Sequence, residues 1–180
     1  ALIVAVCAGQ GTTTRQLAYT FPNAEIVATD VAPDRVAALQ RTFGDHPRVK
    51  VVALDELEPW YGRAELVVLD VPCTNTGVLA RRVEARYRFD DQRLGELVSR
   101  QRQIIADAVR LLAPVRKGGE RGRILYATCS LDARENEEQA QWTDRWHALT
   151  PTRTRRQRPQ GGPGEPPERW TDGSFSVLLG

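Results

Sequence analysis

Short apolar runs alternate with polar segments along most of the chain, and this alternation predicts its secondary structure. The apolar runs are rich in valine, isoleucine, leucine and alanine, and their length is that of buried parallel strands. They occupy residues 2–6, 25–30, 48–54, 65–70 and 123–127. Several of the segments between them place apolar side chains at helical spacing. Strands that alternate with helices predict an α/β fold with a mostly parallel, doubly wound sheet.

Four helices and a last strand complete the predicted outline. We expect helices from residue 15, after Pro33, from a cap at Asp90 or Asp91, and over residues 133–146. The third should end at Pro114 and the glycines at 118 and 119. Residues 151–167 are rich in Pro, Gly, Arg and Gln, which predicts a flexible basic loop. Residues 172–179 predict a turn and a last strand.

The residue totals limit the class of protein. The 180 residues suit one domain, and a net charge of +2 permits nucleic acid as a partner without requiring it. Three widely spaced cysteines, with no C-x-x-C pair, argue against disulfides and a zinc site and favour a reducing, cytoplasmic setting. No apolar run reaches the roughly 18 residues of a membrane span. The chain has no Met and starts inside a predicted strand, so we expect a fragment of a longer protein.

Two cysteines lie at the ends of predicted strands. Residues 70–77 read Asp-Val-Pro-Cys-Thr-Asn-Thr-Gly, and residues 126–130 read Tyr-Ala-Thr-Cys-Ser. Open α/β sheets bind ligands at the carboxyl ends of their strands, and Pro72 forces a turn that holds Cys73 in a stiff segment. Cys73 alone could equally be a buried cysteine without chemistry. Cys129 favours the functional interpretation, because two thiols on one sheet can face the same cleft.

A small-residue loop and two acids at strand ends predict a nucleotide site. Residues 7–14 read Cys-Ala-Gly-Gln-Gly-Thr-Thr-Thr between a strand and a helix, where glycines and helix amides can approach a ligand. Asp30 follows at about 20 residues, the spacing at which a carboxylate meets a ribose, although it could also cap the next helix. Asp55 closes the third predicted strand. The full G-x-G-x-x-G pattern is absent, which disfavours a nicotinamide-dependent oxidoreductase.

A basic segment follows the first cysteine motif. It interleaves arginines with Tyr87 and Phe89, a combination that suits phosphate contact and base stacking. The alternative is a solvated charged face. The candidate RNA-binding residues are Arg81, Arg82, Arg86 and Arg88.

Together these motifs resemble the Sun-type (RsmB-like) family of RNA cytosine-5 methyltransferases. The family's central motif reads Asp-Ala-Pro-Cys-Ser-Gly-Thr-Gly, which is close to residues 70–77. Its second motif reads Tyr-Ser-Thr-Cys-Ser-Leu and then Glu-Asn-Glu, which is close to residues 126–131 and 135–137. Residues 77–82 and 172–175 also look like the family's, so the resemblance covers nearly the whole chain.

The resemblance implies one catalytic domain over residues 1–180, with a Rossmann-like methyltransferase fold, an antiparallel last strand and S-adenosylmethionine (SAM) as cofactor. We expect this chain to be a fragment that lacks the family's N-terminal RNA-binding extension, with that extension lying upstream of it. The resemblance also implies that Cys129 is the nucleophile, that Cys73 helps to release the product, and that Asp70 lies between the cofactor and the target base. The implied cofactor-binding residues are Cys7, Ala8, Gly9, Gln10, Gly11, Thr12, Thr13, Asp30, Asp55 and Asp70.

The chemistry of cytosine methylation explains two thiols and an acid. Carbon 5 of cytosine is a poor nucleophile until a thiolate adds to carbon 6. An acid at ring nitrogen 3 stabilises that adduct, and a base must remove the proton at carbon 5 before the thiol can leave. The base must also be unstacked to reach such a pocket, which favours loops or partly unfolded RNA.

The sequence departs from the family pattern at positions that bear on the cofactor loop and on the cysteines. The family's first motif usually reads Asp-x-Cys-Ala-Ala-Pro-Gly-Gly-Lys-Thr, and here Ala5, Gln10, Thr12 and Thr13 replace its acid, proline, second glycine and lysine. Asn75 replaces a glycine in the central motif. The altered loop leaves open a non-catalytic RNA-binding or assembly module that retains the fold. We favour the active enzyme, acting on rRNA rather than tRNA, as a monomer without a metal ion or membrane contact.

Overall fold

The computed structural model describes residues 1–115, 121–162 and 164–180. Contacts divide the chain into two compact units. The first consists of Ala1–Asp70, Ala106–Leu125 and Gly180, and the second of Val71–Ile105 and Tyr126–Leu179.

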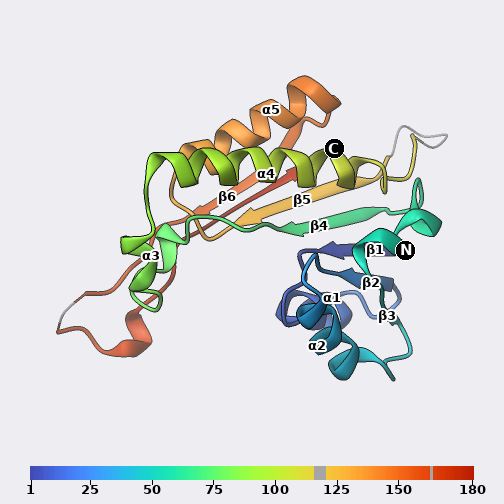
Figure 1. Ribbon diagram of the computed structural model, residues 1–180, viewed down its shortest axis with the longest axis horizontal. Coiled ribbons are helices and arrows are strands. Elements are labelled where there is room, and N and C mark those ends of the chain that lie inside the picture. The colour runs from blue at the N-terminus through green and yellow to red at the C-terminus, as the bar shows by residue number, and fades with distance from the viewer. Residues whose placement is uncertain (116–120, 163) are drawn as a thin grey trace. The chain divides into compact units, whose positions relative to one another are not determined.

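The first unit holds four parallel strands in the order β3-β2-β1-β4. They are β1 (Leu2–Val6), β2 (Glu25–Thr29), β3 (Val49–Val51) and β4 (Leu66–Asp70). Helices α1 (Thr12–Thr20) and α2 (Pro33–Phe43) pack on one face of these strands, as Figure 1 shows. Leu17 of α1 and Leu39 of α2 are buried in one cluster with Ile3 and Ile26, which pair across β1 and β2.

Strand β5 (Arg123–Thr128) begins in the first unit and ends in the second. Beyond it lie β7 (Ser174–Leu179) and β6 (Pro151–Gln157), which are antiparallel to each other. The full strand order is β3-β2-β1-β4-β5-β7-β6. This mostly parallel sheet with an antiparallel last strand confirms the predicted fold class.

The second unit buries one face of β7 together with two helices. Phe175, Val177 and Leu179 alternate along β7 and are all buried, as expected for a strand with one covered face. Helices α4 (Asp91–Val109) and α5 (Glu137–His147) lie side by side in Figure 1. The short helix α3 (Glu84–Tyr87) precedes α4. Asp90 Oδ1 accepts the Arg93 N–H at 2.7 Å, so Asp90 rather than Asp91 caps α4.

Two predicted elements are shorter than expected. Strand β3 ends at Val51, and the chain then turns into a 3₁₀ helix, η1 (Leu54–Glu56), that contains Asp55. The Glu56 carboxylate accepts the Ala53 N–H at 3.1 Å and closes this turn, a local interaction that the apolar pattern did not reveal. The helix expected from residue 133 is also split, because η4 (Ala133–Glu135) and α5 are separated by Asn136.

The predicted flexible loop over residues 151–167 is wrong in its first part. Residues 151–157 form β6, whose backbone pairs with β7. Its side chains are exposed except for the half-buried Gln157, so the strand is held by main-chain pairing rather than by apolar burial. Helix α4 ends at Val109, before Pro114, and the glycines at 118 and 119 lie outside the described residues.

Candidate functional site

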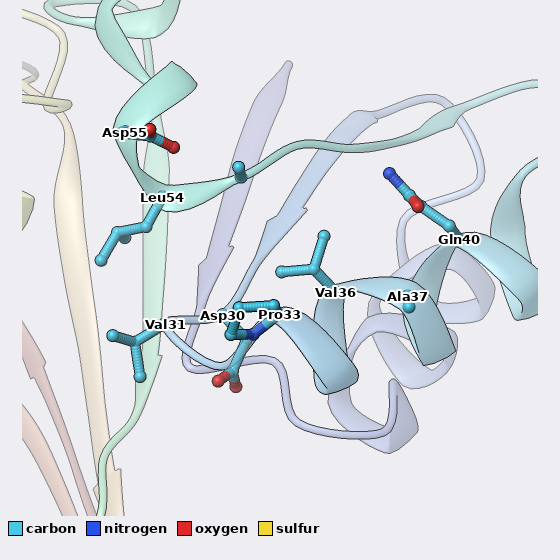
Figure 2. Close-up of a pocket in the computed structure, with 9 residues that line it drawn as sticks. Asp30, Val31, Pro33, Val36, Ala37, Gln40, Leu54 and Asp55 are labelled. Carbon is cyan, nitrogen blue, oxygen red and sulfur yellow. The ribbon is translucent and has the colours of Figure 1, made fainter.

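A pocket of about 480 Å³ opens in the first unit. Figure 2 shows that its walls come from the turn after β2, from α2 and from η1. The walls are largely apolar, and two carboxylates and one amide supply polar groups. Apolar walls with a few carboxylates suit a nucleoside, whose base is flat and whose ribose offers hydroxyl donors. The pocket is lined by Asp30, Val31, Pro33, Val36, Ala37, Gln40, Ala53, Leu54 and Asp55.

Asp30 lies at the carboxyl end of β2 and is 2% exposed. Its carboxylate accepts the Gly9 N–H at 2.9 Å and the Ala32 N–H at 3.1 Å, and Arg35 Nη1 lies 3.6 Å away. The N-cap residue of α2 is Ala32, so Asp30 binds the start of this helix without being its cap residue. An ionised carboxylate has about four acceptor positions. Two backbone bonds therefore leave capacity for a ribose hydroxyl.

The small-residue loop adopts backbone conformations that favour glycine. Gly9 has φ +58° and Gly11 has φ +91°. A Cβ at Gly11 would lie 2.5 Å from Cε2 of Phe43, so this glycine also lets the loop approach α2 closely. Gln10 and Thr12 are exposed. The pocket is lined by Asp30 and Asp55, but not by residues 7–13 of the loop.

Asp70 ends β4 and contacts the same loop. The Thr13 hydroxyl donates to Asp70 Oδ2 at 3.3 Å. Desolvation of the carboxylate raises the pKa of Asp70, and the hydrogen bond from Thr13 partly offsets this. Asp70 therefore keeps its proton to a higher pH than an ordinary aspartate, which suits a proton donor.

The two strand-end cysteines meet in the second unit. Cys73 Sγ and Cys129 Sγ lie 3.3 Å apart, within thiol hydrogen-bond distance. Cys73 is buried and Cys129 is half-buried, and neither forms a disulfide. The contact with Cys129, burial and the nearby charge of Glu135 raise the pKa of the Cys73 thiol. Cys73 is thus held as a protonated thiol beside the more accessible Cys129.

Asn75 contacts both cysteines from the turn between them. Its backbone is left-handed, with φ +60°, a conformation that glycine and asparagine adopt most readily. Its Oδ1 accepts from Cys129 Sγ at 3.0 Å, and its Nδ2 donates to the Cys73 carbonyl at 3.0 Å. Asparagine is therefore compatible with the backbone at position 75, where the family has a glycine. Its side-chain amide also contacts both cysteines.

Three backbone segments of the second unit meet at Gly77. Its N–H donates to the Cys129 carbonyl at 2.8 Å, and its carbonyl accepts the Gly173 N–H at 2.7 Å. A Cβ at Gly77 would lie 2.7 Å from the carbonyl oxygens of both Cys129 and Gly173. The close approach explains why glycines stand at positions 77 and 173, in motifs that are far apart in sequence.

Buried polar side chains surround the cysteine loops, and sequence patterns alone assign them no role. Glu135 and Asn136 are 0% and 1% exposed and belong to the Glu-Asn-Glu motif. Gln101 is 0% exposed on α4. Its signal in the sequence is a polar residue on the apolar stripe that includes Leu94 and Ile105.

The candidate RNA-binding arginines lie on the surface of the second unit. Arg82, Arg86 and Arg88 are exposed, and Tyr87 beside them is 82% exposed. Arg81 forms an ion pair with Asp172 and is therefore less available to a phosphate. The arrangement fits both phosphate contact and a solvated face.

Within the units, the structure thus brings several predicted site residues together: Cys73 with Cys129, Gly9 with Asp30, and Thr13 with Asp70. Their roles remain predictions. In the part of the chain that the structure describes, no group of His, Cys, Asp and Glu has metal-binding geometry. None of the helices among those residues is long and apolar enough to cross a membrane.

The sheet order and helix placement define a Rossmann-like methyltransferase fold, and solved structures agree. The crystal structure of PH0851 is 28% identical, with a TM-score of 0.74 over 99% of this chain and 42% of that one. NSun6 from Pyrococcus horikoshii, solved with SFG, is 25% identical, with a TM-score of 0.71 over 99% of this chain and 47% of that one.

Sequence comparison narrows this class to a family. The model of the 16S rRNA methyltransferase RsmB/F family matches residues 1–167, and the chain belongs to this family. Ribosomal RNA small subunit methyltransferase B of Cronobacter sakazakii is 32% identical over 145 residues, which is 76% of this chain and 32% of that protein. The chain thus spans about one third of the length of the curated relatives that it matches.

Proposed function

We propose that this chain is the catalytic part of a SAM-dependent RNA cytosine-5 methyltransferase that acts on rRNA in the cytoplasm as a monomer. The observation that carries the proposal is the contact between Cys73 and Cys129, which lie 3.3 Å apart in the segments that follow β4 and β5. Family membership supports an RNA methyltransferase, and the relatives named for small-subunit rRNA favour rRNA over tRNA.

SAM fits the residues of the first unit. Asp30 has free acceptor capacity for a ribose, and the apolar walls of the pocket suit an adenine ring. A related structure was solved with SFG, a SAM analogue. The cofactor would supply the methyl group, and residues 7–13 would lie under its methionine end.

The proposed role of Cys129 is attack on carbon 6 of cytosine. A thiolate adds there and makes carbon 5 nucleophilic enough to take the methyl group. Asp70, whose pKa is raised, would donate a hydrogen bond or proton to ring nitrogen 3 and stabilise the adduct. A base then takes the proton from carbon 5, the electrons of that C–H bond form the double bond between carbons 5 and 6, and Cys129 leaves as a thiolate. Cys73 would assist this release as a thiol within hydrogen-bond distance of the departing sulfur.

Separate roles for the cysteines predict opposite trapping behaviour. Cys129→Ala should abolish methylation and form no covalent complex with RNA, because carbon 6 is not attacked. Cys73→Ala should permit attack but slow elimination, so that a protein–RNA adduct survives denaturing electrophoresis. RNA with 5-azacytidine at the target should trap the wild type through Cys129. If Cys129→Ala forms the adduct with RNA and Cys73→Ala does not, the two roles are reversed. If neither substitution alters methylation, the two-thiol mechanism is refuted.

The altered cofactor loop favours a second candidate, a non-catalytic RNA-binding module. Gln10, Thr12 and Thr13 replace a proline, a glycine and a lysine in the cofactor loop. Calorimetry with SAM separates the candidates, because only the enzyme requires binding of the cofactor. The module would be favoured if calorimetry detected no binding of SAM and if the protein transferred no methyl group to RNA isolated from cells that lack the gene.

A further inference from the structure

Glu135 is a buried carboxylate surrounded by neutral donors. It is 0% exposed, and among the described residues no lysine or arginine forms an ion pair with it. A buried carboxylate is costly unless hydrogen bonds replace its hydration. The Thr74 N–H donates to Oε1 at 3.0 Å, the Thr74 hydroxyl to Oε2 at 2.5 Å, and Gln101 Nε2 to Oε1 at 2.9 Å.

These hydrogen bonds hold the loop on both sides of Cys73. Thr74 follows Cys73 directly and is bound to Glu135 through its backbone and its side chain. Pro72 precedes Cys73, and its carbonyl accepts from the same Gln101 amide at 3.0 Å. Glu135 and Gln101 therefore fix both chain neighbours of Cys73.

Asn136, the next residue, holds the loop of Cys129 in the same way. Its Oδ1 accepts from the Thr128 hydroxyl at 2.6 Å, and its Nδ2 donates to the Ser130 carbonyl at 2.9 Å. Thr128 and Ser130 flank Cys129. The Ser130 hydroxyl lies 3.1 Å from that of Thr74, so a hydrogen bond also joins the two loops directly.

We propose that Glu135 is a positioning residue for the cysteine pair: it fixes the Cys73 loop through Thr74 and Gln101, and its position beside the buried Cys73 leaves the half-buried Cys129 as the more readily alkylated sulfur. Asn136 positions Cys129 from the other side. The assignment of a reaction to the pair rests on the proposed function, but the position and protonation of the thiols do not.

The ionisable groups that face Cys73 agree with a raised pKa of its thiol. They are Cys129, Glu135 and Tyr126, and none of them is a cation. Burial, Glu135 and Cys73 raise the pKa of Tyr126, so its phenol stays neutral. After the contact with Cys129 and burial, Glu135 contributes to the raised pKa of the Cys73 thiol, so its replacement by a neutral residue should lower that pKa.

Partial alkylation of the purified protein, without RNA or cofactor, tests the proposal. Wild type and Glu135→Gln are treated with substoichiometric iodoacetamide over a pH series, and peptide mass spectrometry gives the ratio of Cys73 to Cys129 modification. We expect the wild type to react mainly at Cys129. In Glu135→Gln the ratio should rise severalfold, because the Cys73 loop loses its buried anchor and one of the charges that raise the pKa of Cys73 is removed. Glu138→Gln, an exposed acid three residues away, is the matched control and should not alter the ratio.

An unchanged ratio in folded Glu135→Gln, or an equal rise in Glu138→Gln, would overturn the proposal. If Glu135→Gln does not fold, Thr74→Val replaces it. This substitution removes the hydroxyl that binds Glu135 and Ser130, so the Cys73 loop is held less firmly and the ratio should rise in the same direction. An unchanged ratio there would likewise overturn it.

The reaction gives an independent readout. With a methylated RNA substrate, Glu135→Gln should lower kcat at least about tenfold and leave the KM for SAM unchanged, because the pocket of the first unit is intact. A wild type that methylates no RNA would refute the proposed function, whereas the alkylation ratio would still decide the role of Glu135. An unchanged kcat would overturn the positioning role.

Discussion

Asn75 combines a backbone requirement with two side-chain contacts, and substitutions can separate them. Its φ of +60° costs a non-glycine residue such as alanine about 1–2 kcal/mol. Asn75→Gly should keep the turn and lose the amide, whereas Asn75→Ala should lose the amide and add strain. We expect Asn75→Ala to be about 1–2 kcal/mol less stable than Asn75→Gly in urea unfolding. Equal stability of the two variants would show that the backbone does not need this conformation.

The Thr13–Asp70 contact predicts a pH effect. Removing the hydroxyl in Thr13→Val deletes the hydrogen bond that lowers the pKa of Asp70, so this pKa should rise further. An acid with a raised folded pKa costs stability once pH exceeds its unfolded pKa, because folding disfavours the ionised form. The electrostatic penalty of Thr13→Val should therefore be absent at low pH and grow as pH rises through the folded pKa.

Carbon-13 NMR titration of the Asp70 carboxyl gives the midpoint directly. Thr12→Val, at an exposed neighbouring threonine for which no contact to Asp70 is found among the described residues, serves as the control. A Thr13→Val midpoint equal to that of the wild type would remove Thr13 from the environment of Asp70.

At the scale of elements, the site of the second unit depends on the close approach of three backbone segments at Gly77. Gly77→Ala would place a Cβ 2.7 Å from two backbone carbonyls, which cannot move aside as a side-chain end can. We expect a loss of at least about 1–3 kcal/mol in unfolding free energy and displacement of the Cys129 loop. Methylation should fall more than stability alone explains.

A second glycine of the same unit provides the control. Gly95 lies on α4, and a Cβ at this position would have nothing within 4 Å, so Gly95→Ala should stabilise by about 0.5–1 kcal/mol. Denaturant unfolding of both variants tests the contrast. A neutral Gly77→Ala would mean that the three segments can separate without cost.

Elements with strong apolar patterns could be predicted from the sequence, and elements held by polar interactions could not. Strands β1, β2, β4 and β5 follow apolar runs and were predicted within a residue or two. Strand β6 has almost only exposed side chains, so its pairing with β7 left no apolar signal. The break between η4 and α5 arises from Asn136, whose side chain binds Thr128 and Ser130, a tertiary effect that local pattern cannot show.

The same distinction holds for the site residues. Position at strand ends was sufficient to select Cys73, Cys129, Asp30 and Asp70. The thiol contact required the tertiary structure, and so did the role of Glu135, because its hydrogen-bond partners are 61 and 34 residues away in the chain. A sequence pattern marks reactive groups better than the buried groups that orient them.

At the scale of the whole molecule, the attraction for RNA must come from a local cluster of positive charge rather than from the net charge. The net charge is only +2, which gives a weak overall attraction for RNA. Residues 81–88 contain four arginines and one glutamate, a net of +3, so this segment carries more positive charge than the chain as a whole. Exposed Tyr87 adds a ring on which a base can stack. RNA affinity should therefore depend on this segment rather than on total charge.

Charge reversal tests this expectation. Replacing Arg82, Arg86 and Arg88 together by Glu should weaken RNA binding and reduce the salt slope of log K by about 2, since each lost phosphate contact on single-stranded RNA contributes about 0.7. Arg81 is left unchanged because it forms an ion pair with an aspartate. Reversal of Arg153 and Arg155 on β6 changes total charge at exposed positions and is the control. If the slope falls only in the control, the RNA interface includes β6 and residues 81–88 are a solvated face. If both proteins keep the wild-type slope, neither surface contacts phosphates.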